Sequence, residues 1–462
     1  MKHIFKNNQN STWFVVLIVL TLCITACSNL ELDSPKHLIK GETLFTDSNA
    51  VQAAMIGIYA NLRENTLLTG GHQGVSALLG VYADELDYYS PFGLPEEQFY
   101  KNSLSPNDPT ITEVWNNAYN QIYAANAIIE GVADSPYFTL EEQEAFTGEA
   151  LFIRAVIHFY LVNLYGDIPY IKTTNYRINK TVSRLPEARV YDAIITDLLT
   201  AIDYLPDSDS SGENVRPTNS TAKAVLARVY AYNQQWQKAH EYATQVIATD
   251  KWEPSIDNVF LKNSSSTLWQ FSPGASRTNT LEAQSFIVLA APPNTLAITE
   301  SLASSFETED LRKQHWLGSV TDGTTTWYYP YKYKQRLGSG TANEYSIVLR
   351  MAEQFLIRAE ANAHLGNLKQ AQEDINVIRN RAGLPNTTAE TQQQLLDAII
   401  KERRVEFFTE HGHRFFDLKR NQLLNTTLPA IKPGWDSYNV LLPLPEKELL
   451  VNPNLQPQNP GY

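Results

Sequence analysis

The chain has 462 residues, a formal net charge of −13 at neutral pH and 43% hydrophobic residues. An acidic chain is repelled by phosphate, so this charge disfavours nucleic acid as a partner. Both cysteines, Cys23 and Cys27, lie near the N-terminus, which leaves the rest of the chain without disulfides or cysteine-ligated zinc and makes burial of apolar side chains the source of its stability.

The N-terminus carries the pattern of a bacterial lipoprotein signal. Basic residues precede an almost wholly apolar run at 13–24, and the small residue Ala26 stands before Cys27. At ~1.5 Å per residue the run covers about 18 Å, well short of a bilayer core of about 30 Å. We therefore expect a signal peptide at residues 1–26, acylation of Cys27 and a mature body of 27–462 held at a membrane by acyl chains. An N-terminal membrane helix is the alternative.

Helical spacing of apolar residues recurs through the body, and no later segment contains eighteen consecutive apolar residues. The sequence predicts amphipathic helices rather than further membrane spans. Apart from the repeat described next, these helices are expected at Ser48 to Glu64, Ile111 to Ala133, Leu140 to Tyr165, Ala188 to Tyr204, and Ala389 to Glu410.

An internal repeat is visible between residues 218–250 and a segment 132 positions later. Ala227, Ala239 and Ala243 mark a small-residue face in the first copy, and Ala359, Ala371 and Ile375 occupy the equivalent positions in the second. Two helices joined by a short turn and packed through alanine are typical of tetratricopeptide repeats. Coincidental alanine spacing in two amphipathic helices is the alternative interpretation.

Two stretches interrupt the helical pattern, at about 65–109 and 252–344. We expect them to be irregular insertions between helices, and long loops on a rigid frame are where binding sites tend to lie. Their aromatic side chains are the candidate ligand-binding residues. They are Tyr88, Tyr89 and Phe92 in the first stretch, and Trp316, Trp327 and Tyr329 in the second.

The second stretch contains an aromatic string at 327–334. An extended chain would place Trp327, Tyr329, Tyr331 and Tyr333 on one face and Lys332 on the other. Flat aromatic surfaces suit the apolar faces of sugar rings or peptide side chains. A strand packed on the helical body would explain the same pattern, and both interpretations stay open.

Candidate catalytic and metal-binding motifs lack residues at the positions that their chemistry requires. His240 begins a zinc-protease-like string that lacks its second histidine, and 207–212 imitates only half of a calcium loop, so we interpret it as a polar turn. His411 and His413 have no third ligand in register and favour local hydrogen bonding. We expect no catalytic residue, no metal and no cofactor.

Another group of chemically suggestive residues lies at 402–410. Glu402, Arg403, Arg404, Glu406 and Glu410 could be mistaken for an acid/base cluster. On a helix their spacings make them ion-pair neighbours, which favours a structural role.

Several segments, in order along the chain, resemble the signature of the SusD/RagB family of outer-membrane nutrient-binding lipoproteins. The resemblance runs from the cysteine motif to the last residue. The segments are Gly148 to Ala155, Asn163 to Pro169, Tyr191 to Leu198, Ala222 to Tyr230, Arg350 to Glu353, Asn376 to Leu384, Glu402 to Phe407, His413 to Leu418, Leu442 to Pro445, and Gln458 to Tyr462.

The resemblance implies an all-α fold with a tetratricopeptide-like helical body and a loop-rich ligand-binding insertion region. It also implies a binding protein, not an enzyme, displayed on the outer membrane, where it captures oligosaccharides or peptides for a TonB-dependent SusC-like transporter. The acidic residues Glu31 and Asp33 after the cysteine are more separated than in many members, which weakens the case for surface display. A lipid-anchored glycan hydrolase and an assembly scaffold are the alternatives.

Overall fold

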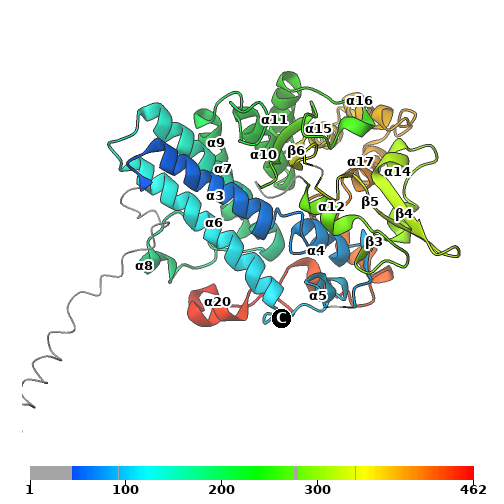
Figure 1. Ribbon diagram of the computed structural model, residues 1–462, viewed down its shortest axis with the longest axis horizontal. Helices are drawn as coiled ribbons and strands as arrows, with labels where there is room; N and C mark the ends of the chain where they lie inside the picture. The colour runs from blue at the N-terminus through cyan, green and yellow to red at the C-terminus, as the bar shows by residue number, and fades with distance from the viewer. Residues whose placement is uncertain (1–43, 92, 275–278, 339) are drawn as a thin grey trace, which may run out of the picture. The chain divides into compact units, whose positions relative to one another are not determined.

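The computed structural model describes residues 44–91, 93–274, 279–338 and 340–462. The predicted signal peptide, Cys27 and the candidate Phe92 therefore lie outside the described residues. Residues Phe45–Tyr462 form one unit with a large apolar core and a second, smaller apolar cluster around Ala371 and Ile375. Most of its ordered elements are helices, as the predicted all-α class requires (Figure 1).

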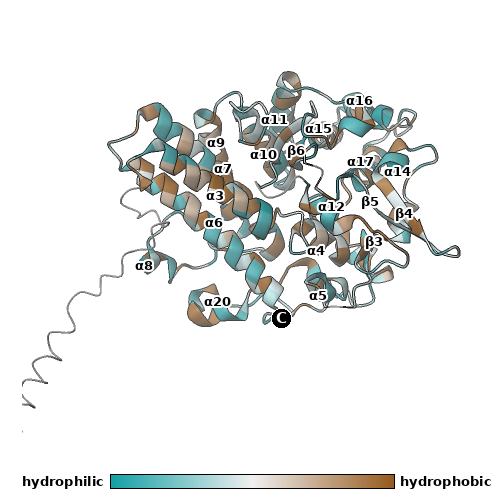
Figure 2. Cartoon of the chain, in the orientation of Figure 1, coloured by the Kyte–Doolittle hydropathy of each residue, from teal (hydrophilic) through white to brown (hydrophobic). Residues whose placement is uncertain are grey.

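The first half of the unit is built from four long helices, each at the place that its apolar spacing predicts. Along α3 and α6, hydrophilic and hydrophobic residues are interspersed (Figure 2), as expected of helices with one buried side. The four helices are α3 (Ser48–Asn65), α6 (Pro109–Ala133), α7 (Leu140–Tyr165) and α9 (Glu187–Tyr204).

Helix α7 is the central helix of this half. Thr139 and Glu142 form a capping box at its start, and Gly166 ends it with a positive φ of 72°. Every residue of α7 from Ala150 to Tyr165 is buried. By length and composition α7 could cross a membrane, but 78% of its most apolar window is buried inside the protein, as in the core helix of a globular body.

The predicted repeat is confirmed as two helical hairpins. Ala239 and Ala371 are both 0% exposed, as close helix packing requires. The hairpins also meet each other, since the Trp236 ring stacks on His364 with centroids 3.9 Å apart. The hairpins consist of α10 (Asn219–Tyr232) with α11 (Trp236–Thr249), and α15 (Met351–His364) with α16 (Leu368–Arg381).

The two insertions contain more regular structure than expected. The first holds α4, whose eight residues are all buried, so it lacks the polar face that gives a helix its periodic signature. The second contributes strands to two small antiparallel sheets, with orders β1-β3-β5-β4 and β2-β6. The helices in the first insertion are α4 (Val75–Tyr82) and α5 (Glu96–Tyr100), and the strands are β1 (Leu86–Tyr88), β2 (Thr267–Phe271), β3 (Leu296–Ile298), β4 (Leu317–Thr321), β5 (Thr326–Pro330) and β6 (Ser346–Arg350).

Shorter helices connect and close these parts. They are α8 (Tyr176–Asn179), α12 (Leu281–Phe286), α13 (Glu300–Ala303), α14 (Leu311–Trp316), α17 (Gln392–Glu406), α18 (His413–Arg420), α19 (Leu424–Thr427) and α20 (Glu446–Val451), with 3₁₀ turns η1 (Ile256–Asn258), η2 (Leu428–Ala430), η3 (Ser437–Val440) and η4 (Pro453–Leu455).

Helix α17 is shorter than the predicted helix at 389–410. Thr391 forms a capping box with Gln394 and fixes its start. After Glu406 the backbone leaves the helix, and Thr409 and His411 both have positive φ. This turn moves Glu410 off the helix. The expected ion pairs between neighbours on one helix do not form, since Arg403 pairs with Asp417 and Arg404 with Asp84.

The charged residues of α17 instead join a buried ion cluster that fastens the second insertion to the helical body. Glu406, 0% exposed, pairs with Arg312 of α14 (3.2 Å), Arg350 of β6 and Arg381 of α16. Glu402 pairs with the same Arg312 at 2.5 Å. The structural role expected of these residues is therefore correct, but their partners lie in distant segments.

Candidate ligand-binding surface

The sheet that contains β1, β3, β5 and β4 has one face toward the core and one toward the outside. Leu86 pairs with Ile298, and Ile298 pairs with Tyr328, so these three side chains share a face. Leu86 and Ile298 are 0% and 5% exposed, which identifies this face as the core face. Because side chains alternate along a strand, Asp87 and Trp327 lie on the outer face.

Two other candidates belong to the same outer face. The Tyr89 N–H donates to the Thr295 carbonyl (2.8 Å), which continues the ladder one residue beyond β1 and places Tyr89 beside Asp87. Tyr329 lies two residues after Trp327 and covers Gly318, where an added Cβ would come within 2.3 Å of its ring. We call Asp87, Tyr89, Trp327 and Tyr329 the outer aromatic face.

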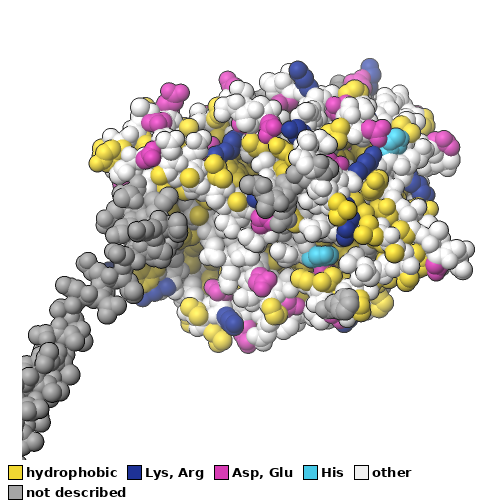
Figure 3. All heavy atoms as spheres, in the orientation of Figure 1, with side chains coloured by type: hydrophobic (Ala, Val, Ile, Leu, Met, Phe, Trp, Pro, Cys, Tyr) yellow, Lys and Arg dark blue, Asp and Glu magenta, His cyan; other side chains and the backbone are white. Residues whose placement is uncertain are grey.

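Direct contact joins the two insertions on this face. Burial and the neighbouring Asp87 raise the pKa of Tyr89, and a hydrogen bond with the Trp327 side chain opposes that rise. Tyr89 remains 38% exposed. Hydrophobic side chains gather on the surface over β3, β4 and β5 (Figure 3). The outer aromatic face therefore offers flat, partly exposed rings with polar groups beside them.

Tyr88 is separated from its neighbour Tyr89 by the strand alternation. Its ring packs against Tyr100 with centroids 6.1 Å apart, and its hydroxyl accepts a hydrogen bond from the Leu94 N–H (2.9 Å). Tyr88 thus holds the loop after β1, and it supports the outer aromatic face from behind.

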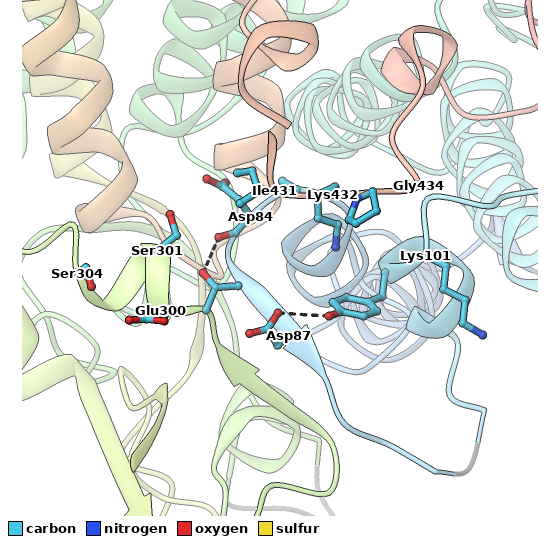
Figure 4. A pocket seen from close by; sticks show the side chains of 13 residues that line it. Asp84, Asp87, Lys101, Glu300, Ser301, Ser304, Ile431, Lys432 and Gly434 are labelled. Carbon is cyan, nitrogen blue, oxygen red and sulfur yellow. Dashed lines mark hydrogen bonds between the residues drawn. The ribbon is translucent and has the colours of Figure 1, made fainter. Parts of the chain in front are cut away.

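A pocket of about 760 Å³ opens next to the outer aromatic face and shares Asp87 with it. Its volume lies in the range of small-molecule sites. Asp87 accepts a hydrogen bond from the Tyr100 hydroxyl, and Figure 4 shows the amino group of Lys101 pointing away from Asp87. The pocket is lined by Ala83, Asp84, Asp87, Tyr100, Lys101, Thr299, Glu300, Ser301, Ser304, Ile431, Lys432, Pro433 and Gly434.

Two charged side chains of the pocket, Asp84 and Lys432, already have partners within the protein. Asp84 accepts hydrogen bonds from Arg414 (2.7 Å) and Arg404 (2.8 Å), and these arginines outweigh its burial and lower its pKa. Lys432 donates to the Val81 carbonyl (2.7 Å), and its ammonium lies 4.0 Å from the Tyr100 ring centroid. Burial lowers the pKa of Lys432 to about 8.

Asp87 is the carboxylate best placed to meet a ligand. The Tyr100 hydroxyl donates to it only at 3.4 Å. Burial raises its pKa, although Lys432 and Tyr100 oppose the rise. A half-buried carboxylate beside aromatic rings can accept hydrogen bonds from the hydroxyls of a bound ligand.

Trp316 has a packing role in place of the predicted ligand-facing one. It is 1% exposed, its indole N–H donates to the Ile256 carbonyl (3.2 Å), and its ring meets Phe260 edge-on at 5.2 Å. Burial of both the ring and its polar atom leaves no surface for a ligand. A short helix gives too few residues for the sequence to indicate whether an aromatic side chain points into the core or toward solvent.

The aromatic string also departs from simple alternation after β5 ends at Pro330. Tyr333 and Lys332 are both buried, and the Lys332 ammonium donates to the carbonyls of Glu406 and Phe408 (2.8 Å each). Lys332 therefore belongs to the buried ion cluster. Of the shared face expected for 327–333, Trp327 and Tyr329 lie within the strand and the Tyr331 ring meets Tyr329 edge-on at 5.8 Å, whereas Tyr333 is buried in the core.

The other chemically suggestive residues have local partners. Asp209 accepts hydrogen bonds from the backbone of Ser211 (3.0 Å) and Val215 (2.9 Å), as the interpretation of a polar turn predicts. His411 hydrogen-bonds to the Ile347 carbonyl (3.0 Å), and His413 lies 3.2 Å from Arg403. Among the residues that the structure describes, no group of three His, Cys, Asp or Glu side chains could hold a metal ion.

Sequence reasoning missed the pocket residues after α19, Ile431 to Gly434, and did not single out Tyr100 or Glu300 as candidates. Lys432-Pro433-Gly434 is a turn signal with no feature that indicates a ligand. These residues meet Asp87 only through long-range folding.

Comparison with known proteins gives matches over most of the chain. Residues 227–440 match the model of the SusD family, and residues 86–231 match a model described as starch-binding associating with outer membrane. A SusD-like protein of Formosa agariphila is 28% identical, over 97% of this chain and 99% of its own length.

Solved structures show the same fold. A SusD superfamily protein from Bacteroides vulgatus has a TM-score of 0.80 at 22% identity, covering 91% of this chain and 100% of that one. A laminarin-binding SusD-like protein has a TM-score of 0.75 at 23% identity, covering 90% of this chain and 99% of that one.

Proposed function

We propose that this chain, which belongs to the SusD/RagB family, binds nutrient oligosaccharides at the cell surface and delivers them to a TonB-dependent SusC-like transporter. The family membership supports a binding protein in preference to an enzyme. The wording of the second family model and the laminarin-binding relative favour a glycan over a peptide as ligand.

The observation that carries the proposal is the outer aromatic face beside the 760 Å³ pocket. Tyr89 and Trp327 offer flat surfaces to the apolar faces of sugar rings, and Asp87 accepts hydrogen bonds from their hydroxyls. Because the two rings come from different insertions, one ligand can bridge both. Tyr329 extends the same surface along β5.

The direct test is calorimetry on Tyr89→Ala and Trp327→Ala with laminarihexaose, maltohexaose and a mixed tripeptide library as probes. By analogy with the loss of a stacked base, each variant should bind its sugar about 5- to 150-fold more weakly. Tyr137→Ala, which removes a tyrosine that is 66% exposed elsewhere, is the matched control and should bind like the parent.

The same titrations discriminate the alternatives. Binding of peptides but not sugars would assign the site to peptide capture. Release of shorter sugars during incubation would indicate the lipid-anchored hydrolase. Unchanged sugar binding in both variants would remove the outer aromatic face from the proposal.

We also propose that Cys27 is acylated and anchors the protein in the outer membrane. The support is the apolar run at 13–24 followed by Ala26 and Cys27. The Cys27→Ala variant should lose both palmitate labelling and its recovery in the membrane fraction. Labelling that persists in this variant would disprove the anchor, while co-purification with the transporter tests the partner independently.

A further inference from the structure

A second groove, of about 340 Å³, lies along α6 in the first half of the unit. One wall is α6, and the other is formed by the segment after α8 together with α20 and η4. It shares no lining residue with the 760 Å³ pocket. Its volume is sufficient for a small ligand.

The α6 wall combines aromatic rings with amides. Residues three or four apart on a helix are neighbours, so Asn116, Tyr119, Asn120 and Tyr123 form one strip. Tyr119 is held in place, because its hydroxyl donates to the Pro169 carbonyl (2.9 Å) and its ring packs on Trp115 at 4.7 Å. Tyr123 is 54% exposed and has its ring available for stacking.

The amides on this strip are not used by the fold. Asn116 and Asn120 are exposed, and their side chains make no hydrogen bond to any other residue of the described chain. An amide can donate and accept at once, which matches the dual character of a sugar hydroxyl. Two free amides beside an exposed ring make this strip polar, which favours a hydroxyl-rich small ligand over a protein partner.

The opposite wall is rigid and nearly neutral. Asn179 donates to the Thr173 carbonyl (2.7 Å) and Asn452 donates to the Val182 carbonyl (2.8 Å), so the two amides are fixed with the wall. Lys180 and Glu448 contribute one charge of each sign. The groove therefore presents little net charge to attract an anionic ligand.

From this geometry we infer that the α6 groove is a second binding site for neutral oligosaccharides, separate from the outer aromatic face. Tyr123 stacks on a pyranose ring, and Asn116 and Asn120 hydrogen-bond its hydroxyls. Two such sites on one chain would hold a long glycan at two points or increase its local concentration.

The experiment uses the purified full-length chain and a microarray of neutral plant, algal and microbial oligosaccharides, with calorimetry on each positive sugar. A Tyr89→Ala, Trp327→Ala double variant first weakens the outer aromatic face. Tyr123→Ala and Asn120→Ala are then added to it separately. Tyr123→Phe keeps the stacking ring, and Tyr137→Ala is the surface control.

The expected result is residual sugar binding in the double variant that Tyr123→Ala weakens about 5- to 150-fold and Tyr123→Phe preserves. Asn120→Ala should weaken it about tenfold, as loss of one hydrogen bond does. Circular dichroism should be unchanged throughout, since both side chains are exposed.

Four results would overturn the inference. Complete loss of binding in the double variant would leave the outer aromatic face as the proposed site and remove the groove. Residual sugar binding that Tyr123→Ala leaves unchanged would place the second site outside the α6 groove. Sugar binding that is unchanged while co-purification with the transporter falls would make the groove a protein contact. A parent chain that binds no sugar on the array would reject both sites.

Discussion

The helical hairpins and the second insertion are held in the body of the protein by different means. The hairpins α10–α11 and α15–α16 pack through small side chains such as Ala239 and Ala371, which are fully buried. The second insertion is attached through charges, since Arg312 and Arg350 reach Glu402 and Glu406 in the interior. Packing of alanines tolerates no larger group, whereas a buried ion cluster tolerates no missing partner.

This difference bears on the proposed binding site. For the proposed role, aromatic residues on the outer face must stay exposed to a ligand, so they cannot also supply the burial that holds their strands. The ion cluster supplies attachment from the other side, at the ends of β6 and α14. We expect changes in the cluster to disturb the outer aromatic face, and changes in the hairpins to leave it intact until the whole chain unfolds.

The largest expected effect is that of Glu406→Gln. This change leaves Arg312, Arg350 and Arg381 buried with too little negative charge, and loss of one partner from a buried ion pair costs about 3–5 kcal/mol. Urea denaturation followed by circular dichroism measures it. Glu373→Gln, at an exposed pair with Lys369, is the control and should cost less than about 1 kcal/mol. Equal effects would mean that the cluster does not attach the insertion.

A smaller effect is expected for Ala371→Leu in the second hairpin. Overpacking of this contact should lower the free energy of unfolding by about 1–3 kcal/mol. The same change at Ala248, which is exposed on α11, should be nearly neutral. A melting temperature of the Ala371→Leu variant that matches the parent would argue against tight packing at this position.

Taken per pH unit, the smallest effect is that of Glu85, which directly precedes β1 in the first insertion. Burial, with help from Asp84, raises the pKa of Glu85 to about 8. A raised pKa stabilises the fold below the unfolded pKa of about 4.3, and that stabilisation is lost as the pH rises through 8, by at most ~1.4 kcal/mol per pH unit. The Glu85→Gln variant should therefore lose less stability than the parent between pH 5 and pH 9.

Denaturation of both proteins across this range provides the measurement. The Ala371→Leu variant should keep the parent's pH profile, because no titrating group is added or removed. Parallel profiles for Glu85→Gln and the parent would show that the carboxyl does not titrate as inferred.

The hairpins could be predicted from sequence because their information is local. Ala239 and Ala371 lie at helical spacing from their neighbours, and the 132-residue shift reveals the second copy. Helix α4 could not be found in this way, since burial on all sides removes the periodic contrast. The ion cluster was equally hidden, because Arg312 and Glu402 are ninety positions apart.

The candidate site was predictable only in part. The alternation of side chains along a strand predicts that Trp327 and Tyr329 share one face, and within β5 they do. The strand ends at Pro330, so the alternation no longer applies at Tyr333, which is buried. The sequence makes both Tyr88 and Tyr89 candidates, but strand alternation places their side chains on opposite faces. The proximity of Tyr89 to Trp327 depends on β1 pairing with β3, and β3 with β5, which no local pattern shows.

The long apolar helix α7 has a consequence for how the chain is made. A protein that is exported must thread this helix through a translocation channel, where segments of such hydropathy can stop and insert into the bilayer. Arg154 lies near its middle, and an arginine at the centre of a nascent span opposes insertion by about 2.5–3.5 kcal/mol. After folding, the same guanidinium is neutralised by Asp197 at 2.7 Å. If the chain is exported as proposed, Arg154 opposes membrane insertion of α7 in addition to forming its ion pair in the core, and fractionation of an Arg154→Leu variant should find part of the chain retained in the inner membrane.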